Sequence, residues 1–294
     1  MLRRQGGSEP LKLNVWRQNT QPRRTPSIWR SQMSSTNTSP IVGSTGGVQK
    51  PEGVTLGIGL TCPSPELAQV CAHAGFDVVL IDMEHGPISI ETAYRMVMAL
   101  VGTKAEAWIR VAYNDVALIK LALDTGAKEV VVPMVTTKAE AEQAVSASKY
   151  PPKGIRGWGP FRPQYQWQTN MLDYAKRANT ETRLSVLIEH PRAIENIDEI
   201  LAVEGLGGAI AAPLDLAVNM GFADGPGHPE VQEAIAYASK KIAAKGFPLA
   251  SFAVTPEQGQ LAIARGAKLL FLGFDTMFIP AAVQGYLSRL SSAK

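Results

Sequence analysis

Three titratable side chains follow one apolar run of the sequence within four positions. The run Asp77–Ile81 leads into the segment DMEHGP, which contains Asp82, Glu84 and His85. Histidine has an ordinary pKa that suits proton transfer near neutral pH, and acids beside it can orient it or shift that pKa. A lone histidine is more often structural, but the flanking acids Asp82 and Glu84 and the position after a predicted strand lead us to expect a catalytic His85.

A guanidinium group lies inside another apolar run, Ala107–Val111, at Arg110. A buried arginine needs a partner for its charge. Its planar fork suits a carboxylate or an enolate oxygen, so we expect Arg110 to bind an anionic oxygen of a substrate. A structural ion pair with an acid of the same fold is the alternative.

Two carboxylates follow two successive apolar runs. Glu189 comes directly after Leu184–Ile188, and Asp215 comes four positions after Gly208–Ala211. Oxygen ligands of this kind favour hard divalent ions such as Mg²⁺ or Mn²⁺. The alternative is structural, with Asp215 capping a helix and Glu189 paired with Arg192.

Short apolar runs that alternate with amphipathic stretches provide the elements that would position these residues. The expected strands are Thr55–Leu60, Asp77–Ile81, Ala107–Val111, Glu129–Val132, Leu184–Ile188, Gly208–Ala211, Pro248–Phe252 and Lys268–Gly273. The expected helices are Pro65–Ala74, Ile90–Leu100, Val116–Asp124, Lys138–Ser148, Ala193–Ala202, Pro229–Lys245, Pro256–Arg265 and Met277–Leu290. Eight strand–helix units predict a closed parallel (β/α)₈ TIM barrel, in which catalytic residues follow the carboxyl ends of the strands.

Composition separates a basic extension from the predicted barrel. Of 294 residues, 45% are hydrophobic, which is enough for a full core. Residues 1–50 carry eight basic side chains and one acid, so residues 51–294 carry a net charge of −4 within a total of +3. An acidic barrel argues against nucleic-acid binding. We expect residues 1–52 to be a disordered extension or a transit peptide, which makes a mitochondrial location possible and a cytoplasmic one the alternative.

Two further features bear on the compartment of the protein. The cysteines Cys62 and Cys71 cannot form a disulfide framework, which indicates a reducing compartment. The longest apolar runs are shorter than 18 residues, so we expect no membrane span.

Five blocks of sequence resemble the HpcH/HpaI aldolase family, whose members are metal-dependent enzymes that act on 2-oxo acids. The blocks are GFDVVLIDMEHGP (75–87), WIRVAYNDVALIKLALDTGAKEVVVPMV (108–135), YPPKGIRGWG (150–159), VLIEHPRAIENIDEILAVEGLGG (186–208) and PLDLAVNMGFADGPGHPEV (213–231). The resemblance implies a (β/α)₈ barrel of the phosphoenolpyruvate/pyruvate type over residues 53–294.

The resemblance also implies roles for individual residues. Glu189 and Asp215 would bind a divalent cation (Mg²⁺, Mn²⁺ or Co²⁺), and Arg110 would hold the ketone or enolate oxygen. His85 would be the acid–base group and Asp124 would pair with it, while backbone amides around Ala212, Pro213 and Leu214 would receive the substrate carboxylate. Asp82 and Glu84 would support the waters of the metal and nearby hydrogen bonds. Family members are commonly hexamers built from dimers that exchange their last helix, so Met277–Leu290 would pack on a neighbour in a homo-oligomer.

The sequence departs from the family pattern on the aldehyde side of the site. Many members have Gln where Leu187 stands, and Ser or Thr where His190 stands. The usual Gly-Pro-Ala-Asp reads Ala212-Pro213-Leu214-Asp215 here. The metal pair, His85 and Arg110 are retained, so these changes reshape the pocket for the aldehyde rather than remove the chemistry.

The resulting hypothesis is a retro-aldol cleavage of a 4-hydroxy-2-oxo acid to pyruvate and an aldehyde. The substrate could be a 2-keto-3-deoxy sugar acid such as 2-keto-3-deoxy-L-rhamnonate, and the partners would be small 2-oxo acids and aldehydes. Two alternatives are a CoA-thioester lyase of the citrate-lyase β type and a non-catalytic barrel that binds a 2-oxo acid.

Overall fold

The computed structural model describes residues 50–292. The predicted basic extension, and with it the transit-peptide hypothesis, lies almost entirely outside the described residues. Among the described residues, no helix has the length and apolar character that a membrane crossing requires.

Eight parallel strands make the central sheet of the described region. They are β1 (Thr55–Leu60), β2 (Val78–Asp82), β3 (Glu106–Arg110), β4 (Glu129–Val132), β5 (Arg183–Ile188), β6 (Gly208–Ala211), β7 (Ala250–Phe252) and β8 (Leu269–Phe274). The sheet runs in the order β6-β5-β4-β3-β2-β1-β8-β7, so that the ends of the order approach each other in a nearly closed barrel. The predicted barrel is confirmed, and each predicted strand lies within two residues of its observed bounds.

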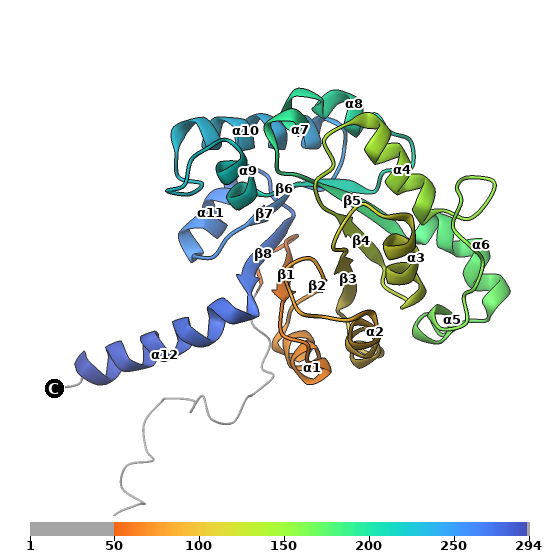
Figure 1. Ribbon diagram of the computed structural model, residues 1–294. Coiled ribbons are helices and arrows are strands. Elements are labelled where there is room, and N and C mark those ends of the chain that lie inside the picture. The colour runs from red at the N-terminus through yellow and green to blue at the C-terminus, as the bar shows by residue number, and fades with distance from the viewer. Residues whose placement is uncertain (1–49, 293–294) are drawn as a thin grey trace, which may run out of the picture. The chain divides into compact units, whose positions relative to one another are not determined.

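Helices cover the outside of this barrel (Figure 1). They are α1 (Pro65–Ala74), α2 (Ile90–Ala99), α3 (Val116–Asp124), α4 (Lys138–Ser148), α5 (Pro163–Gln166), α6 (Met171–Glu181), α7 (Pro191–Glu195), α8 (Ile197–Leu201), α9 (Pro213–Asn219), α10 (Pro229–Ala244), α11 (Pro256–Ala264) and α12 (Asp275–Ser292). Three of these, α5, α6 and α9, were not predicted. The helix predicted at Ala193–Ala202 is in fact two short helices, because Asn196 leaves helical geometry at φ −93° and ψ 11°.

Local sequence signals explain where the helices begin and end. Ser64 caps α1 by accepting the backbone N–H of Leu67, and Thr137 forms a capping box with Glu140 at the start of α4. The turn from α1 to β2 passes through Gly75 at φ 110°, a conformation that a residue with a Cβ adopts only at a cost.

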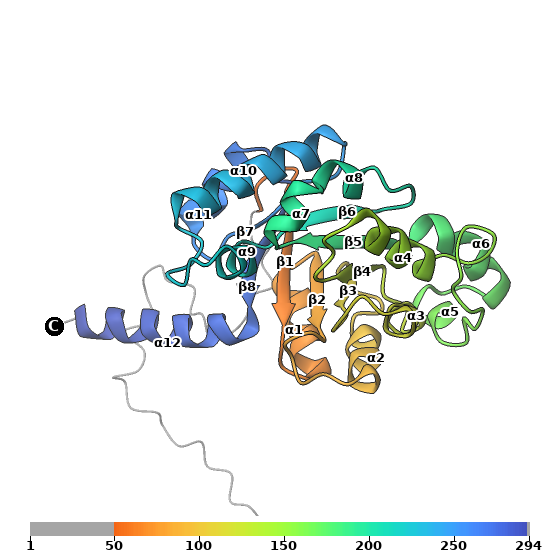
Figure 2. The ribbon, with the colours of Figure 1, turned by 45° about the horizontal axis from the view of Figure 1, so that its top comes forward.

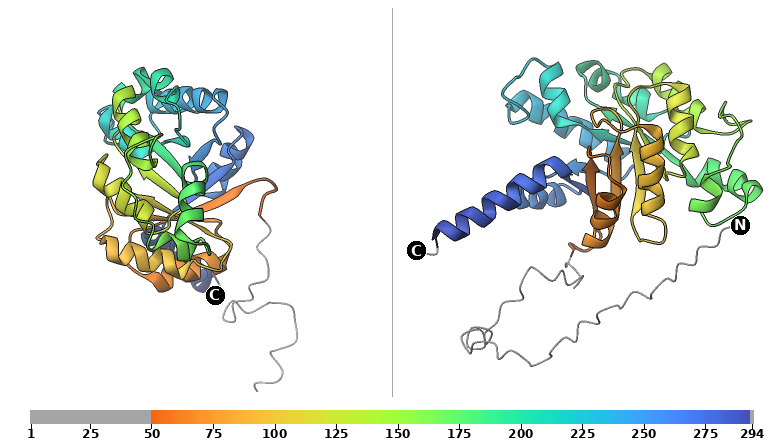
Figure 3. Two further views of the ribbon diagram at one scale, coloured as in Figure 1. Left: turned by 90° about the vertical axis from the view of Figure 1, so that its right-hand side faces the viewer. Right: turned by 60° about the horizontal axis from the view of Figure 1, so that its bottom comes forward.

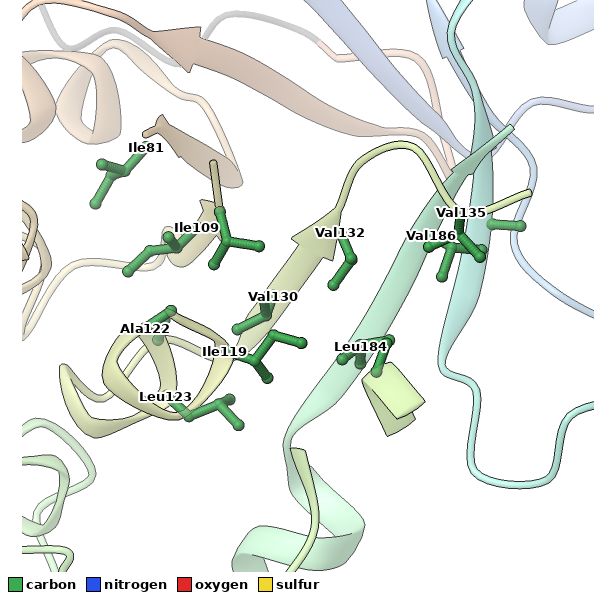
Figure 4. Packing of buried hydrophobic residues seen from close by; sticks show 14 of the residues in the cluster. Ile81, Ile109, Ile119, Ala122, Leu123, Val130, Val132, Val135, Leu184 and Val186 are labelled. Carbon is green, nitrogen blue, oxygen red and sulfur yellow. The ribbon is translucent and has the colours of Figure 1, made fainter. Parts of the chain in front are cut away.

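Apolar side chains fill both faces of the strands, as expected for a buried parallel sheet. Outside the barrel, Ile119 and Leu123 of α3 pack near Ile109 and Val130 of the strands (Figure 4). Inside the barrel, the core consists of Val78, Leu80, Trp108, Val131, Leu187, Ile210, Ala250, Leu269 and Phe271. Gly57 of β1 makes room for this inner core, because a Cβ built there would lie 2.7 Å from the ring of Phe271.

One seam interrupts the barrel. Within residues 50–292, each strand is hydrogen-bonded to its neighbours in the order given, but no strand pairing joins β6 to β7. Helix α10 packs against β6 and helix α11 packs against β7 and β8, so the two helices flank this line (Figures 1 and 2).

The last helix, α12, leaves the barrel instead of packing along it (Figure 3). Its first turn is attached to the fold, where Phe278 meets the ring of Phe76 edge-on with centroids 6.2 Å apart. Its remaining apolar side chains are exposed: Ile279, Val283, Tyr286, Leu287 and Leu290.

Candidate active site

The centre of the site is an ion pair between two adjacent strands. Parallel pairing places Asp82, the last residue of β2, opposite Arg110, the last residue of β3. Arg110 Nε donates to Asp82 Oδ1 at 2.8 Å and Nη2 donates to Oδ2 at 2.6 Å. Asp82 is fully buried and Arg110 is nearly so. The structural ion pair considered for Arg110 is therefore present, and it lies at the mouth of the barrel where substrate chemistry is expected.

The segment after β2 carries Glu84 and His85 to the same place. Asp82 Oδ1 also accepts the backbone N–H groups of Glu84 at 3.1 Å and His85 at 3.4 Å, which holds the turn against the arginine. Glu84 Oε2 lies 3.0 Å from Arg110 Nη1 and 3.7 Å from His85 Nε2. The His85 side chain is 64% exposed, so it can reach a ligand in the mouth.

Glu189 follows β5 and is buried, with 2% of the residue exposed. Its Oε1 accepts the backbone N–H of Met134 at 2.5 Å, and its carbonyl accepts Asn219 Nδ2 at 2.8 Å. Burial raises the pKa of Glu189 to about 7, and the negative charges of Asp215 and Glu84 add to the effect.

Asp215 lies in the first turn of α9 and lines the same cavity as His85 and Arg110. The structural alternative for this pair is not observed among the described residues. Ala212, not Asp215, is the N-cap of α9, and Glu189 makes no ion pair with Arg192. Asp215 therefore lines the cavity at the mouth of the barrel, whereas Glu189 is buried and is not among the residues that line it.

Asp124 is the predicted site residue that the structure places elsewhere. It is the last residue of α3, and a helix that returns antiparallel to its strand ends at the opposite rim of the barrel. There its Oδ1 accepts Arg156 Nη2 at 2.7 Å, and Arg156 is itself fully buried. Within one chain, the predicted pairing of Asp124 with His85 is not formed.

A cavity of about 910 Å³ extends from the mouth of the barrel, at His85 and Arg110, through the barrel interior to helices α10 and α11, where Lys240 and Gln258 line it. Its rim includes residues that the sequence assigned to the substrate: Arg110, Leu187, Ala212, Pro213 and Leu214. Leu187 is buried in the wall, whereas Leu214 is 55% exposed.

The donor set of the site suits a divalent cation. Four carboxylates, Asp82, Glu84, Glu189 and Asp215, face one guanidinium, so the site carries excess negative charge. Glu84 Oε2 is buried, and although it lies 3.0 Å from Arg110 Nη1 it accepts no hydrogen bond from the described residues. Residues 50–292 hold no cluster of three or more His, Cys, Asp or Glu arranged to bind a metal alone. Glu189 and Asp215 could thus supply two ligands, with substrate and water completing the set.

Sequence reasoning missed two residues that support this site. Met134 holds Glu189 through its backbone, and nothing about a methionine signals that role. Thr61 lines the cavity directly after β1 and could have been found by the same strand-end rule that identified Asp82.

Enzymes with a (β/α)₈ barrel carry their active sites at the carboxyl ends of the strands. This chain has an acid–arginine network and two further carboxylates at that end, so its fold and site are those of a barrel enzyme. The family model described as HpcH/HpaI aldolase/citrate lyase matches residues 58–282. The chain is 36% identical over 241 residues to 2-keto-3-deoxy-L-rhamnonate aldolase of Escherichia coli strain K12, which covers 82% of this chain and 90% of that protein. This chain belongs to the HpcH/HpaI aldolase/citrate lyase family.

Solved structures agree with the family assignment. An HpcH/HpaI aldolase/citrate lyase family protein from Burkholderia cenocepacia J2315 matches with a TM-score of 0.76 at 26% identity, covering 81% of this chain and 95% of that one. The HpcH/HpaI aldolase from Desulfitobacterium hafniense DCB-2 matches with a TM-score of 0.73 at 27% identity, covering 82% and 93%. The predicted family, fold and enzyme class are confirmed.

Proposed function

We propose that this protein cleaves a 4-hydroxy-2-oxo acid to pyruvate and an aldehyde in a retro-aldol reaction assisted by a divalent cation. The observation that carries the proposal is the placement of His85, Arg110 and Asp215 around one cavity beside the buried carboxylate of Glu189. The identity to a protein named as an aldolase supports carbon–carbon lyase chemistry, and its name favours a 2-keto-3-deoxy sugar acid such as 2-keto-3-deoxy-L-rhamnonate.

His85 and Arg110 divide the proton and charge chemistry between them. In cleavage, His85 accepts the proton of the C4 hydroxyl, directly or through water, as the C3–C4 bond breaks. The electron pair of that bond forms the C2–C3 double bond of the pyruvate enolate, so negative charge develops on the former C2 ketone oxygen. Protonation of C3, by His85 or through water, then gives pyruvate. Arg110 uses three nitrogens for Asp82 and Glu84, but its Nη atoms retain N–H groups that can stabilise the C2 oxygen.

Glu189 and Asp215 would hold the cation, and the backbone N–H groups of Leu214 and Asp215 in the first turn of α9 would receive the substrate carboxylate. The N–H of Ala212 donates instead to the carbonyl of Ile188 at 3.2 Å. A cation held by the two carboxylates would withdraw electron density from the 2-oxo acid and so lower the barrier to bond cleavage. Asp82 and Glu84 keep Arg110 and His85 in place and compensate the charge of the guanidinium.

Removal of metal tests the proposed chemistry directly. We expect EDTA to abolish pyruvate release and Mg²⁺, Mn²⁺ or Co²⁺ to restore it, because without a cation the two carboxylates repel the negative charge that develops on the substrate. Full activity in chelator, together with borohydride trapping of a lysine adduct, would show a Schiff-base mechanism instead.

Replacement of His85 by alanine tests the proton carrier. We expect turnover to fall by roughly 10²-fold or more with the fold unchanged, since proton transfer is lost. His73→Ala is a matched control, because His73 is an exposed histidine of α1. Equal turnover of His85→Ala and the control would remove His85 from the mechanism.

A single set of assays distinguishes the two alternative functions from the proposed one. Pyruvate release over several 2-keto-3-deoxy acids identifies the substrate, and the exposed Leu214 and buried Leu187 favour a small, weakly charged aldehyde portion. Cleavage of a CoA thioester alone would support a citrate-lyase β-type activity. Binding of Mg²⁺ and pyruvate by calorimetry without any cleavage would support the non-catalytic barrel.

We also propose that the enzyme is a homo-oligomer, and the family resemblance suggests a hexamer. The support is α12, which leaves the barrel (Figure 3) and whose apolar residues are exposed in the isolated chain. Such a continuous apolar face is typical of a surface that a second chain covers.

A further inference from the structure

Met134 adopts a backbone conformation that L-amino acids rarely take. It follows β4 and has φ 54°, in the left-handed region that favours glycine. Its side chain is 41% exposed, so side-chain packing does not account for the conformation. A strained backbone at the mouth of a site calls for another cause.

The hydrogen bond to Glu189 supplies that cause. The left-handed turn directs the backbone N–H of Met134 to Glu189 Oε1, at 2.5 Å. No described residue donates a hydrogen bond to the other carboxylate oxygen, Oε2. Asn219 Nδ2 holds the carbonyl of Glu189 at 2.8 Å, so both the backbone and the side chain of Glu189 are anchored.

The loop around Met134 is held on both sides, which keeps the strained turn from relaxing. Pro133 and Val135 are buried. The carbonyl of Thr136 accepts Asn196 Nδ2 at 2.9 Å, and the backbone N–H of Thr136 donates to Glu140 Oε2 at 2.7 Å.

We propose that Met134 is a positioning residue for the divalent cation, acting through its backbone and not through its side chain. The left-handed turn sets the orientation of the Glu189 carboxylate and leaves Oε2 free as a ligand. This inference rests on the proposed metal-assisted function. It predicts that metal affinity depends on how readily residue 134 adopts a positive φ.

Substitutions at position 134 separate the backbone from the side chain. Glycine and asparagine accept a positive φ, leucine resembles methionine, and valine resists this conformation because it branches at Cβ. The measurement is the Kd of Mn²⁺ by titration calorimetry on chelator-treated protein without substrate. We expect Met134→Gly, Met134→Asn and Met134→Leu to stay within about 3-fold of the unaltered protein and Met134→Val to bind about 10-fold more weakly or worse.

Circular dichroism and thermal unfolding in chelator check that each variant is folded. If Met134→Val is insoluble, the other variants still decide, because a 10-fold loss in Met134→Gly or Met134→Asn would show that the side chain acts and would overturn the proposal. Unchanged affinity in a folded Met134→Val would overturn it as well. If the unaltered protein binds no divalent cation, the proposed metal-assisted function itself fails, and this inference fails with it.

Discussion

At the scale of single residues, the site depends on how a buried arginine is neutralised. Arg110 meets Asp82 through two hydrogen bonds and Glu84 through a third contact at 3.0 Å. Leaving such a charge without its partner is far more costly than replacing the pair, because the guanidinium stays desolvated. Asp82 also accepts the backbone N–H groups of the His85 turn, so it connects the two groups that act on substrate.

Replacement of Asp82 by asparagine should therefore reduce both stability and turnover. We expect the free energy of unfolding to fall by about 3 kcal/mol and turnover to fall about 10-fold or more. Urea denaturation and pyruvate release measure the two effects. Glu91→Gln, which alters an exposed ion pair with Arg95 on α2, is the control and should leave both quantities nearly unchanged. An active, fully stable Asp82→Asn protein would show that Arg110 needs no partner on β2.

Much of this residue-scale arrangement was predictable, and its gaps have physical reasons. Asp82, Arg110 and Glu189 were found because polar residues at the carboxyl ends of buried strands meet at one face of a barrel. Asp124 could not be placed by that rule, since it ends a helix and not a strand. Met134 was missed because its contribution is a backbone N–H, which every residue except proline has.

At the scale of elements, Asp275 joins the end of the barrel to its beginning. It is the first residue of α12, directly after β8, and its carboxylate accepts the backbone N–H groups of Thr61 and Cys62 after β1, at 2.8 to 3.1 Å. Burial opposes ionisation of this carboxyl group, but these N–H groups outweigh that effect and lower its pKa.

This lowered pKa makes the junction sensitive to acid. The folded state binds the Asp275 proton less tightly than the unfolded chain, so ionised Asp275 stabilises the fold above its unfolded pKa, about 3.9. That contribution is lost as the pH falls through the lower folded value. We expect urea denaturation between pH 6 and pH 2 to show Asp275→Asn less stable than the unaltered protein at pH 6, with the difference shrinking as the pH falls. A constant difference would mean that the charge of Asp275 does not matter.

Element prediction failed where the apolar period was faint. Only Tyr174 and Ala178 of α6 are buried, so its sequence gives too few apolar positions to distinguish a helix from a long connection. Helix α9 has seven residues, begins with proline and lacks a side-chain N-cap, so the signals that mark a helix start were missing except Pro213. The eight strands were predictable because their apolar runs are continuous.

At the scale of the whole molecule, the repeat of eight units predicted the barrel, and α12 bears on assembly. Its exposed apolar residues contribute no burial of apolar surface in an isolated chain, so we expect them to be buried between copies of the chain. Ile279→Asp together with Tyr286→Asp places two charges on this face, where both side chains are more than 60% exposed. We expect sedimentation velocity to show smaller species than for the unaltered protein. Ser288→Asp, a change at an already polar position of α12, is the control and should assemble normally. Unaltered sedimentation of the double variant would place the contacts between copies elsewhere.

The seam between β6 and β7 has a consequence for how the mouth of the barrel can move. A closed barrel, in which every strand is hydrogen-bonded to two neighbours, resists widening because any widening breaks backbone hydrogen bonds. Among residues 50–292, strand pairing is missing only between β6 and β7, so the structure is a curled sheet with these two as its edge strands. Such a sheet can widen or narrow by bending. The strands farthest from its edges, β2 and β3, keep Asp82 and Arg110 in register as it bends.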